Sequence, residues 1–271
     1  TFARRPLSYW ASRFDDLDPA DLEEARRIIK NEIGVMESDG TAAKIEKLGC
    51  WLITQWKGGS GTPSDQIEKE KSPLRIFKMV LNGQGRIWCS QHALIYHFFA
   101  NMAGMPSRLV SLAGRVDNVI TTGHAFAETF IPEQGGWAKV DLSTNNMLIL
   151  NPEGRALASA DVYNAIVTGN IEGLTARRCQ DGAPASVPYT EVKDTDSYYY
   201  TPGSNLVFKP GRERPQSRLA RYLIRPDWAY SLDLSALQRT YTKRRVLFLG
   251  TCGIAALWLV SLCGAVLGKR G

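Results

Sequence analysis

The chain has 271 residues, of which 44% are hydrophobic and 22% are charged. This composition is typical of a globular protein and excludes an intrinsically disordered chain, a collagen-like repeat and a small disulfide-stapled domain. The length suits one large domain or two modest ones. The cysteines show no C-x-x-C spacing, and this argues against both a zinc finger and a disulfide framework. They are Cys50, Cys89, Cys179, Cys252 and Cys263.

The net charge of +6 is concentrated near the C-terminus. Residues 201–245 carry ten Lys and Arg side chains against three acidic ones, so residues 1–200 are slightly acidic as a whole. A basic patch beside an apolar segment indicates a membrane surface rather than a nucleic acid. We therefore expect a lipid bilayer as a partner and no nucleic acid.

Residues 246–268 are 23 consecutive residues without a charge. As a helix they would span about 34 Å, enough for a hydrocarbon core of about 30 Å. The segment predicts one C-terminal transmembrane helix; a buried core helix of a soluble protein is the alternative. Gly264 and Gly268 form a small-xxx-small pair, which suits contact with other membrane-protein subunits.

The orientation of this anchor stays open at this stage. More cations precede the span than follow it, which favours a cytoplasmic body by the positive-inside rule. The sequence begins at Thr1 rather than Met; after a cleaved secretory signal the body would instead be exported.

The first half of the chain predicts helices in succession. Residues 18–38 begin with Asp-Pro and an acidic turn, and residues 41–56 place apolar side chains on one face. A loop over residues 58–65 follows. Residues 72–81 and 89–103 then predict two more helices, the second ended by Gly and Pro.

The pattern then changes to short alternating runs over residues 108–113, 124–131 and 137–142, which predict strands. Helices followed by an antiparallel sheet make an α+β domain. Residues 180–216 predict an irregular connection, and residues 219–239 a juxtamembrane helix interrupted by proline.

Cys89 stands where a glycine-containing loop meets the start of an apolar helix. The segment from Gly83 runs GQGRIWCSQHALIYHFF. A helix N-terminus carries about half a positive charge, which favours the thiolate over the thiol. Its free N–H groups also face whatever the sulfur attacks and stabilise an oxyanion. Cys89 is therefore the candidate nucleophile.

His124 and Asp141 supply the partners of a thiol triad. His124 begins a predicted strand in TTGHAFAETF, and Asp141 ends the next strand in GGWAKVDLS. If residues 132–136 join these strands as a hairpin, the carboxylate approaches one ring nitrogen and leaves the other for the sulfur. This is the order of nucleophile, base and orienting group.

These blocks, together with the helix exit GMPSRLV and the W-x-x-x-D spacing that ends at Asp141, resemble the transglutaminase-like superfamily over residues 40–150. The resemblance implies a papain/transglutaminase-like core of helices packed on an antiparallel sheet. It also implies that Cys89 is the nucleophile, His124 the general base and acid, and Asp141 the orienting carboxylate. Residues 1–200 would form the catalytic domain.

The chain departs from that family at two points. Trp88 precedes the cysteine where members often carry a small residue, and the side-chain oxyanion donor has no clear counterpart. By analogy with papain-like enzymes Gln84 is a candidate for this donor; Trp51 and Trp56 are others.

Each site residue also has a purely structural interpretation. Cys89 alone would be a buried core thiol, His124 a structural histidine and Asp141 a turn cap; their order and positions favour the triad. His92 and His97 follow the cysteine in the predicted helix, but no fourth zinc ligand is evident, so we expect no metal and no cofactor.

Three functions remain for this site. The first is a membrane-anchored cysteine hydrolase that cleaves amide bonds of a peptide or protein through an acyl-enzyme. The second is transfer of the same acyl group to an amine, as in a transglutaminase. The third is a non-catalytic scaffold that docks into a membrane complex through its C-terminal helix.

Overall fold

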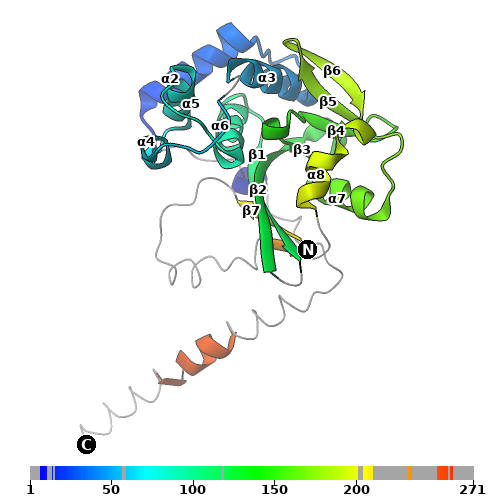
Figure 1. Ribbon diagram of the computed structural model, residues 1–271. Coiled ribbons are helices and arrows are strands. Elements are labelled where there is room, and N and C mark those ends of the chain that lie inside the picture. Colours follow the sequence, from blue (N-terminus) through cyan, green and yellow to red (C-terminus); the bar gives the residue numbers. More distant parts are fainter. Residues whose placement is uncertain are drawn as a thin grey trace, which may run out of the picture.

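The computed structural model shows an α+β fold of helices and antiparallel sheets (Figure 1). It describes residues 7–10, 14, 16–56, 59–116, 119–200, 204–209, 231–233, 249–255 and 257–258.

Helices fill the first part of the chain, close to where the sequence predicts them. Asp18 and Ser72 cap two of these helices with their side chains and are each followed by proline, which is pre-organised for the first helical position. Below residue 103 the helices are α1 (Leu7–Trp10), α2 (Pro19–Ile28) with a π-helical turn (Ile29–Ile33), α3 (Thr41–Gln55), α4 (Asp65–Lys69), α5 (Pro73–Leu81) and α6 (Cys89–Met102).

The main sheet has the strand order β3-β2-β1-β7-β8, with every neighbouring pair antiparallel. The predicted hairpin is confirmed: β2 and β3 pair across a short 3₁₀ turn, Pro132–Gln134. β7 pairs with β1, so the folded body continues beyond residue 200. The strands are β1 (Ser107–Val116), β2 (Val119–Ile131), β3 (Gly136–Val140), β7 (Asn205–Lys209) and β8 (Ser231–Asp233).

A second sheet, of strand order β4-β5-β6, corrects the prediction of an irregular connection over residues 180–216. Asp181 and Gly182 both have positive φ and form a tight turn that suits a β-hairpin. An Asp-Gly pair between two strands is the local sequence signal for such a hairpin. This part of the chain contains β4 (Leu148–Leu150), α7 (Ser159–Thr168), β5 (Thr175–Gln180), β6 (Ala183–Pro188) and α8 (Lys193–Tyr199).

The main sheet is buried on both faces. Successive side chains of a strand point to opposite faces, and accordingly Leu109 packs with the core beneath α2, α3, α5 and α6, whereas Val110 packs with the core beneath α7 and α8. The same alternation holds in β2 after His124. Phe126 lies in the core beneath α7 and α8, and Ala127 lies in the core beneath α2, α3, α5 and α6. The site described below therefore rests on a rigid layer.

A disulfide joins Cys50 of α3 to Cys179 of β5, and this corrects the expectation of no disulfide framework. Their 129-residue separation hides the pair from any local spacing rule. The same two elements are tied by Arg177, whose guanidinium donates to both carboxylate oxygens of Glu46 at 2.7 and 2.9 Å. The second sheet is thus fastened to the helical layer.

The predicted anchor lies largely outside the described residues. Residues 249–255 and 257–258 are helical, and Leu249, Ile254, Leu257 and Trp258 are exposed. Within the described residues, no helix is both long and apolar enough to cross a bilayer. Of the predicted juxtamembrane helix, residues 231–233 form β8 instead, and the remainder lies outside the described ranges. The transmembrane segment stays a prediction.

Candidate active site

Cys89 occupies the first position of α6, as the sequence predicts. Trp88 is the N-cap residue, and its backbone N–H donates to the Gln91 side chain at 3.1 Å, which closes the first turn. The loop before the helix runs close to α4: a Cβ at Gly85 would lie 2.6 Å from Cδ1 of Ile67. Glycine at this point lets the loop pack there and set the start of the helix. The Cys89 thiol is partly exposed and not disulfide-bonded.

His124 and Asp141 form a buried pair. Nε2 of His124 lies 2.6 Å from Oδ2 of Asp141, and the two side chains are 3% and 1% exposed. Nδ1 of His124 is also buried and has no hydrogen-bond partner of good geometry among the described residues, while the Cys89 thiol is close enough to couple electrostatically with the ring. The structure thus brings together the three residues that the sequence selects, in the order thiol, imidazole, carboxylate.

The electrostatics of the thiol and the imidazole are coupled. Burial raises the pKa of Cys89, but the hydrogen bond and positive charge of His124, with a hydrogen bond from the Ala125 backbone N–H, leave this pKa below its ordinary value. Burial disfavours the charged imidazole, yet Asp141 and then Cys89 raise the pKa of His124 to about 9. The lowered pKa of Cys89 and the raised pKa of His124 both shift the pair towards thiolate and imidazolium, which is the reactive form of a catalytic cysteine.

His124, Lys139 and Ser143 all stabilise the ionised carboxylate of Asp141. Burial opposes its charge, but His124, Lys139 and Ser143 together hold the pKa of Asp141 below its usual range. Ser143 Oγ donates to Oδ1 of Asp141 at 2.7 Å, and Lys139 Nζ lies 3.7 Å from Oδ2. Lys139 in turn pairs with the buried Asp196 of α8. The carboxylate is therefore fixed in both position and charge.

Tyr199, the last residue of α8, stacks on the ring of His124. Its ring centroid lies 4.2 Å from that of His124, and the planes are 11° apart. Burial and the negative charges of Cys89 and Asp141 raise the pKa of Tyr199, so the phenol stays neutral. An aromatic face against an imidazolium is a favourable cation–π contact. Tyr199 is therefore placed to hold the ring and favour its protonated form.

Sequence reasoning missed three of these partners. Lys139 precedes Asp141 by two residues along the same strand direction, so alternation places both side chains on one face, and this signal was available. Asp196 and Tyr199 carry no such signal, because α8 reaches the site only through the tertiary fold.

Gln84 is not joined to the site. Its side chain is exposed, and within the described part of the chain no hydrogen bond links it to Cys89 or His124. Its backbone N–H instead donates to Met79, which closes the turn after α5. The backbone N–H of Cys89 lies in the first turn of a 14-residue helix, where N–H groups have no partner within the helix, and it is therefore the candidate oxyanion donor. The role of Gln84 stays a prediction.

His92 and His97 are both buried in α6 but serve the core. His92 accepts or donates a hydrogen bond with Ser60 at 3.1 Å and packs edge-on against Trp56. Burial lowers the pKa of His92 to about 4, so this ring is neutral. No group of three or more His, Cys, Asp or Glu side chains that could hold a metal occurs among the described residues.

Comparison of this chain with protein families, with curated proteins and with solved structures finds no match. The argument for function therefore rests on the geometry of the site.

Proposed function

We propose that this protein is a cysteine hydrolase of the transglutaminase-like type that cleaves amide bonds in a peptide or protein. One observation carries the proposal: a partly exposed thiol at a helix N-terminus interacts with a buried imidazole whose far nitrogen is 2.6 Å from a buried carboxylate. Nucleophile, base and orienting group are the parts that acyl transfer by a thiol requires.

The reaction follows from these positions. The Cys89 thiolate attacks the amide carbonyl carbon, and the carbonyl oxygen becomes an oxyanion that the Cys89 N–H stabilises. The C–N bond then breaks as His124 gives its proton to the leaving amine, which leaves a thioester on Cys89. Water next gives a proton to His124 and its oxygen attacks the thioester carbon; the C–S bond then breaks, the carboxylic acid leaves, and the Cys89 thiolate and the protonated His124 are restored as an ion pair. Asp141 stays ionised throughout and orients the ring.

The disulfide bears on where this reaction takes place. Structural disulfides form and persist in oxidising compartments and are rare in the reducing cytosol. The Cys50–Cys179 bond is buried on both sides, so it supports a catalytic body on the exported side of the membrane. The charges that flank the span favour the cytoplasmic side, but that imbalance is small. We place the body, and hence its substrates, outside the cytosol, anchored by residues 246–268.

Iodoacetamide labelling tests the catalytic assignment. At neutral pH and with the disulfide intact, Cys89 is expected to react at least about tenfold faster than an ordinary exposed thiol, because a larger share of it is thiolate. His124→Ala removes this advantage. Ordinary reactivity in the wild-type protein would instead support the scaffold interpretation.

An amide-release assay with and without a primary amine separates the two enzyme functions. Hydrolysis releases the free acid, and Cys89→Ala abolishes this release. Incorporation of the amine without release of the acid would assign acyl transfer in place of hydrolysis.

A further inference from the structure

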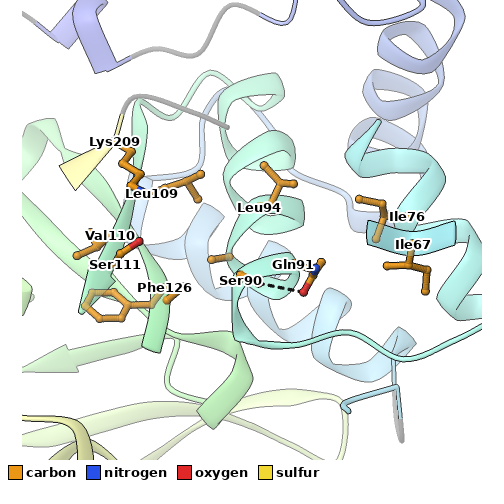
Figure 2. A pocket seen from close by; sticks show the side chains of 12 residues that line it. Ile67, Ile76, Ser90, Gln91, Leu94, Leu109, Val110, Ser111, Phe126 and Lys209 are labelled. Carbon is orange, nitrogen blue, oxygen red and sulfur yellow. Dashed lines mark hydrogen bonds between the residues drawn. The ribbon is translucent and has the colours of Figure 1, made fainter. Parts of the chain in front are cut away.

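A cavity opens on the face of the main sheet that α6 covers (Figure 2). Its lining includes Ser90, the residue after Cys89, and Ala125, the residue after His124. The Ala125 backbone N–H also donates to the Cys89 thiol. The chain neighbours of both Cys89 and His124 therefore contribute to the cavity wall.

The register of the strands explains the floor of this cavity. Ser111 lies opposite Ala125, and Leu109 lies opposite Lys209. Directly opposed residues of antiparallel strands share a face, and so do residues two apart along one strand. All four side chains consequently point to the same side, where they face Leu94 of α6.

The rest of the wall is apolar except at Ser90 and Gln91, which lie at the N-terminal end of α6. Ile67 of α4 and Ile76 of α5 lie across from the sheet side, and both are almost fully buried. The volume of about 280 Å³ is just below the range of roughly 300–1,000 Å³ that small-molecule sites occupy. A cavity of this size takes one large side chain rather than an extended ligand.

We propose that this cavity binds an apolar side chain on the acyl side of the scissile amide, so that the enzyme selects peptides with a leucine- or phenylalanine-like residue there. The proposal rests on the proposed function and names the substrate class of that site. The acyl group stays attached to Cys89 during the reaction, and the cavity is lined by Ala125, whose backbone N–H donates to this sulfur. An apolar wall stabilises an apolar occupant by removing its surface from water.

A basic side chain belongs to the opposite class of occupant. A lysine or arginine would lose its hydration against the apolar part of the wall, formed by Ile67, Ile76 and Leu94. We therefore expect the enzyme to discriminate against basic residues at this position.

The test measures how fast Cys89 reacts with acetylated dipeptide chloromethyl ketones, using the full-length protein in detergent. Each of the two residues of the probe is varied in turn among Gly, Leu, Phe and Lys. At one position Leu or Phe is expected to react roughly 10- to 100-fold faster than Gly, and Lys no faster than Gly.

Variants of residues that line the cavity test whether the side-chain preference arises there. Ser111→Leu fills the cavity and is expected to reduce the ratio of the Leu rate to the Gly rate to about one, whereas Leu94→Ala enlarges it and shifts the preference towards Phe. Because each result is a ratio within one variant, a general loss of reactivity does not imitate it. Ala185→Leu, in β6 of the second sheet, is the matched control and keeps the wild-type ratio.

Two failures are distinguishable. If Cys89 is hyper-reactive towards iodoacetamide but shows no side-chain preference at either probe position, the cavity proposal is wrong and the proposed function stands. If Cys89 shows ordinary reactivity towards iodoacetamide, both are wrong.

Discussion

Replacing Asp141 by asparagine tests whether the buried carboxylate sets the charge state of the site. Asparagine keeps the shape of the side chain but removes its negative charge. In the wild-type protein the pKa of His124 is raised from 6.5 to about 9, which corresponds to about 3 kcal/mol in favour of the imidazolium. Asp141 is the main source of this stabilisation, and burial acts against it.

The expected effect follows from the sign of these contributions. Without the carboxylate, burial dominates and the pKa of His124 falls below 6.5, so less than about a quarter of the rings are protonated at pH 7. The thiolate then loses its counter-charge, and the pKa of Cys89 rises towards its ordinary value. Alkylation of Cys89 at pH 7 is expected to fall at least about tenfold.

The assay is the rate of iodoacetamide labelling of Cys89 between pH 5 and pH 10, read by mass spectrometry of the labelled peptide. The wild-type rate falls at a lower pH than that of an ordinary thiol, because the pKa of Cys89 is lowered, and it changes again near pH 9, where His124 loses its proton. The variant rate rises through the pH range of an ordinary thiol. Asp39→Asn, an acid that instead bonds Lys47, is the control and keeps the wild-type profile. Superimposable profiles for Asp141→Asn and the wild type would refute the reasoning.

Further predictions concern other parts of the structure. Tyr199→Ala is expected to lower the upper pKa of the labelling profile and reduce the rate at pH 8 by up to about tenfold, whereas Tyr199→Phe keeps both, because only the ring face is needed; an unchanged profile in the alanine variant would remove the positioning role. The double variant Cys50→Ala, Cys179→Ala is expected to lose up to about 5 kcal/mol of unfolding free energy, from the loop of 129 residues that the bond closes, and urea unfolding of both proteins without reductant measures the difference. The lowered pKa of Asp141 stabilises the fold above pH 4 and this contribution is lost as the pH falls, so the melting temperature of Asp141→Asn should change less between pH 6 and pH 3 than that of the wild type. Deletion of residues 246–271 is expected to release the body from the membrane fraction, and an impermeant protease added to intact cells should cut the anchored body only if it is exported.

Much of the fold could be predicted because its signals are local. A capping side chain followed by proline starts α2 and α5, and the glycine-containing loop before the apolar run places Cys89 at the start of α6. The β2–β3 hairpin likewise follows from two alternating runs and a short turn between them. Because these signals act within a few residues, the sequence was sufficient to select Cys89, His124 and Asp141 as one group.

Other features were beyond such signals because their partners are far apart in the chain. The Cys50–Cys179 bond and the stacking of Tyr199 on His124 depend on how β5 and α8 pack against earlier elements. The second sheet was missed for a different reason. Its strands are short, and a segment rich in proline, glycine and serine is typical of an irregular connection, even though it contains the Asp-Gly turn of a hairpin.

The sequence by itself thus determined the class of the fold, the helix N-terminus that carries the thiol and the identity of the three candidate site residues, since helix starts and strand alternation are read from neighbours in the chain. Only the tertiary structure decided how those groups are charged and what lies beside them. The low pKa of Asp141, the ring of Tyr199 over His124 and the apolar cavity next to Ala125 each arise from burial and contact between distant segments. Desolvation and Coulomb interactions depend on distance in space, and no spacing along the chain specifies them.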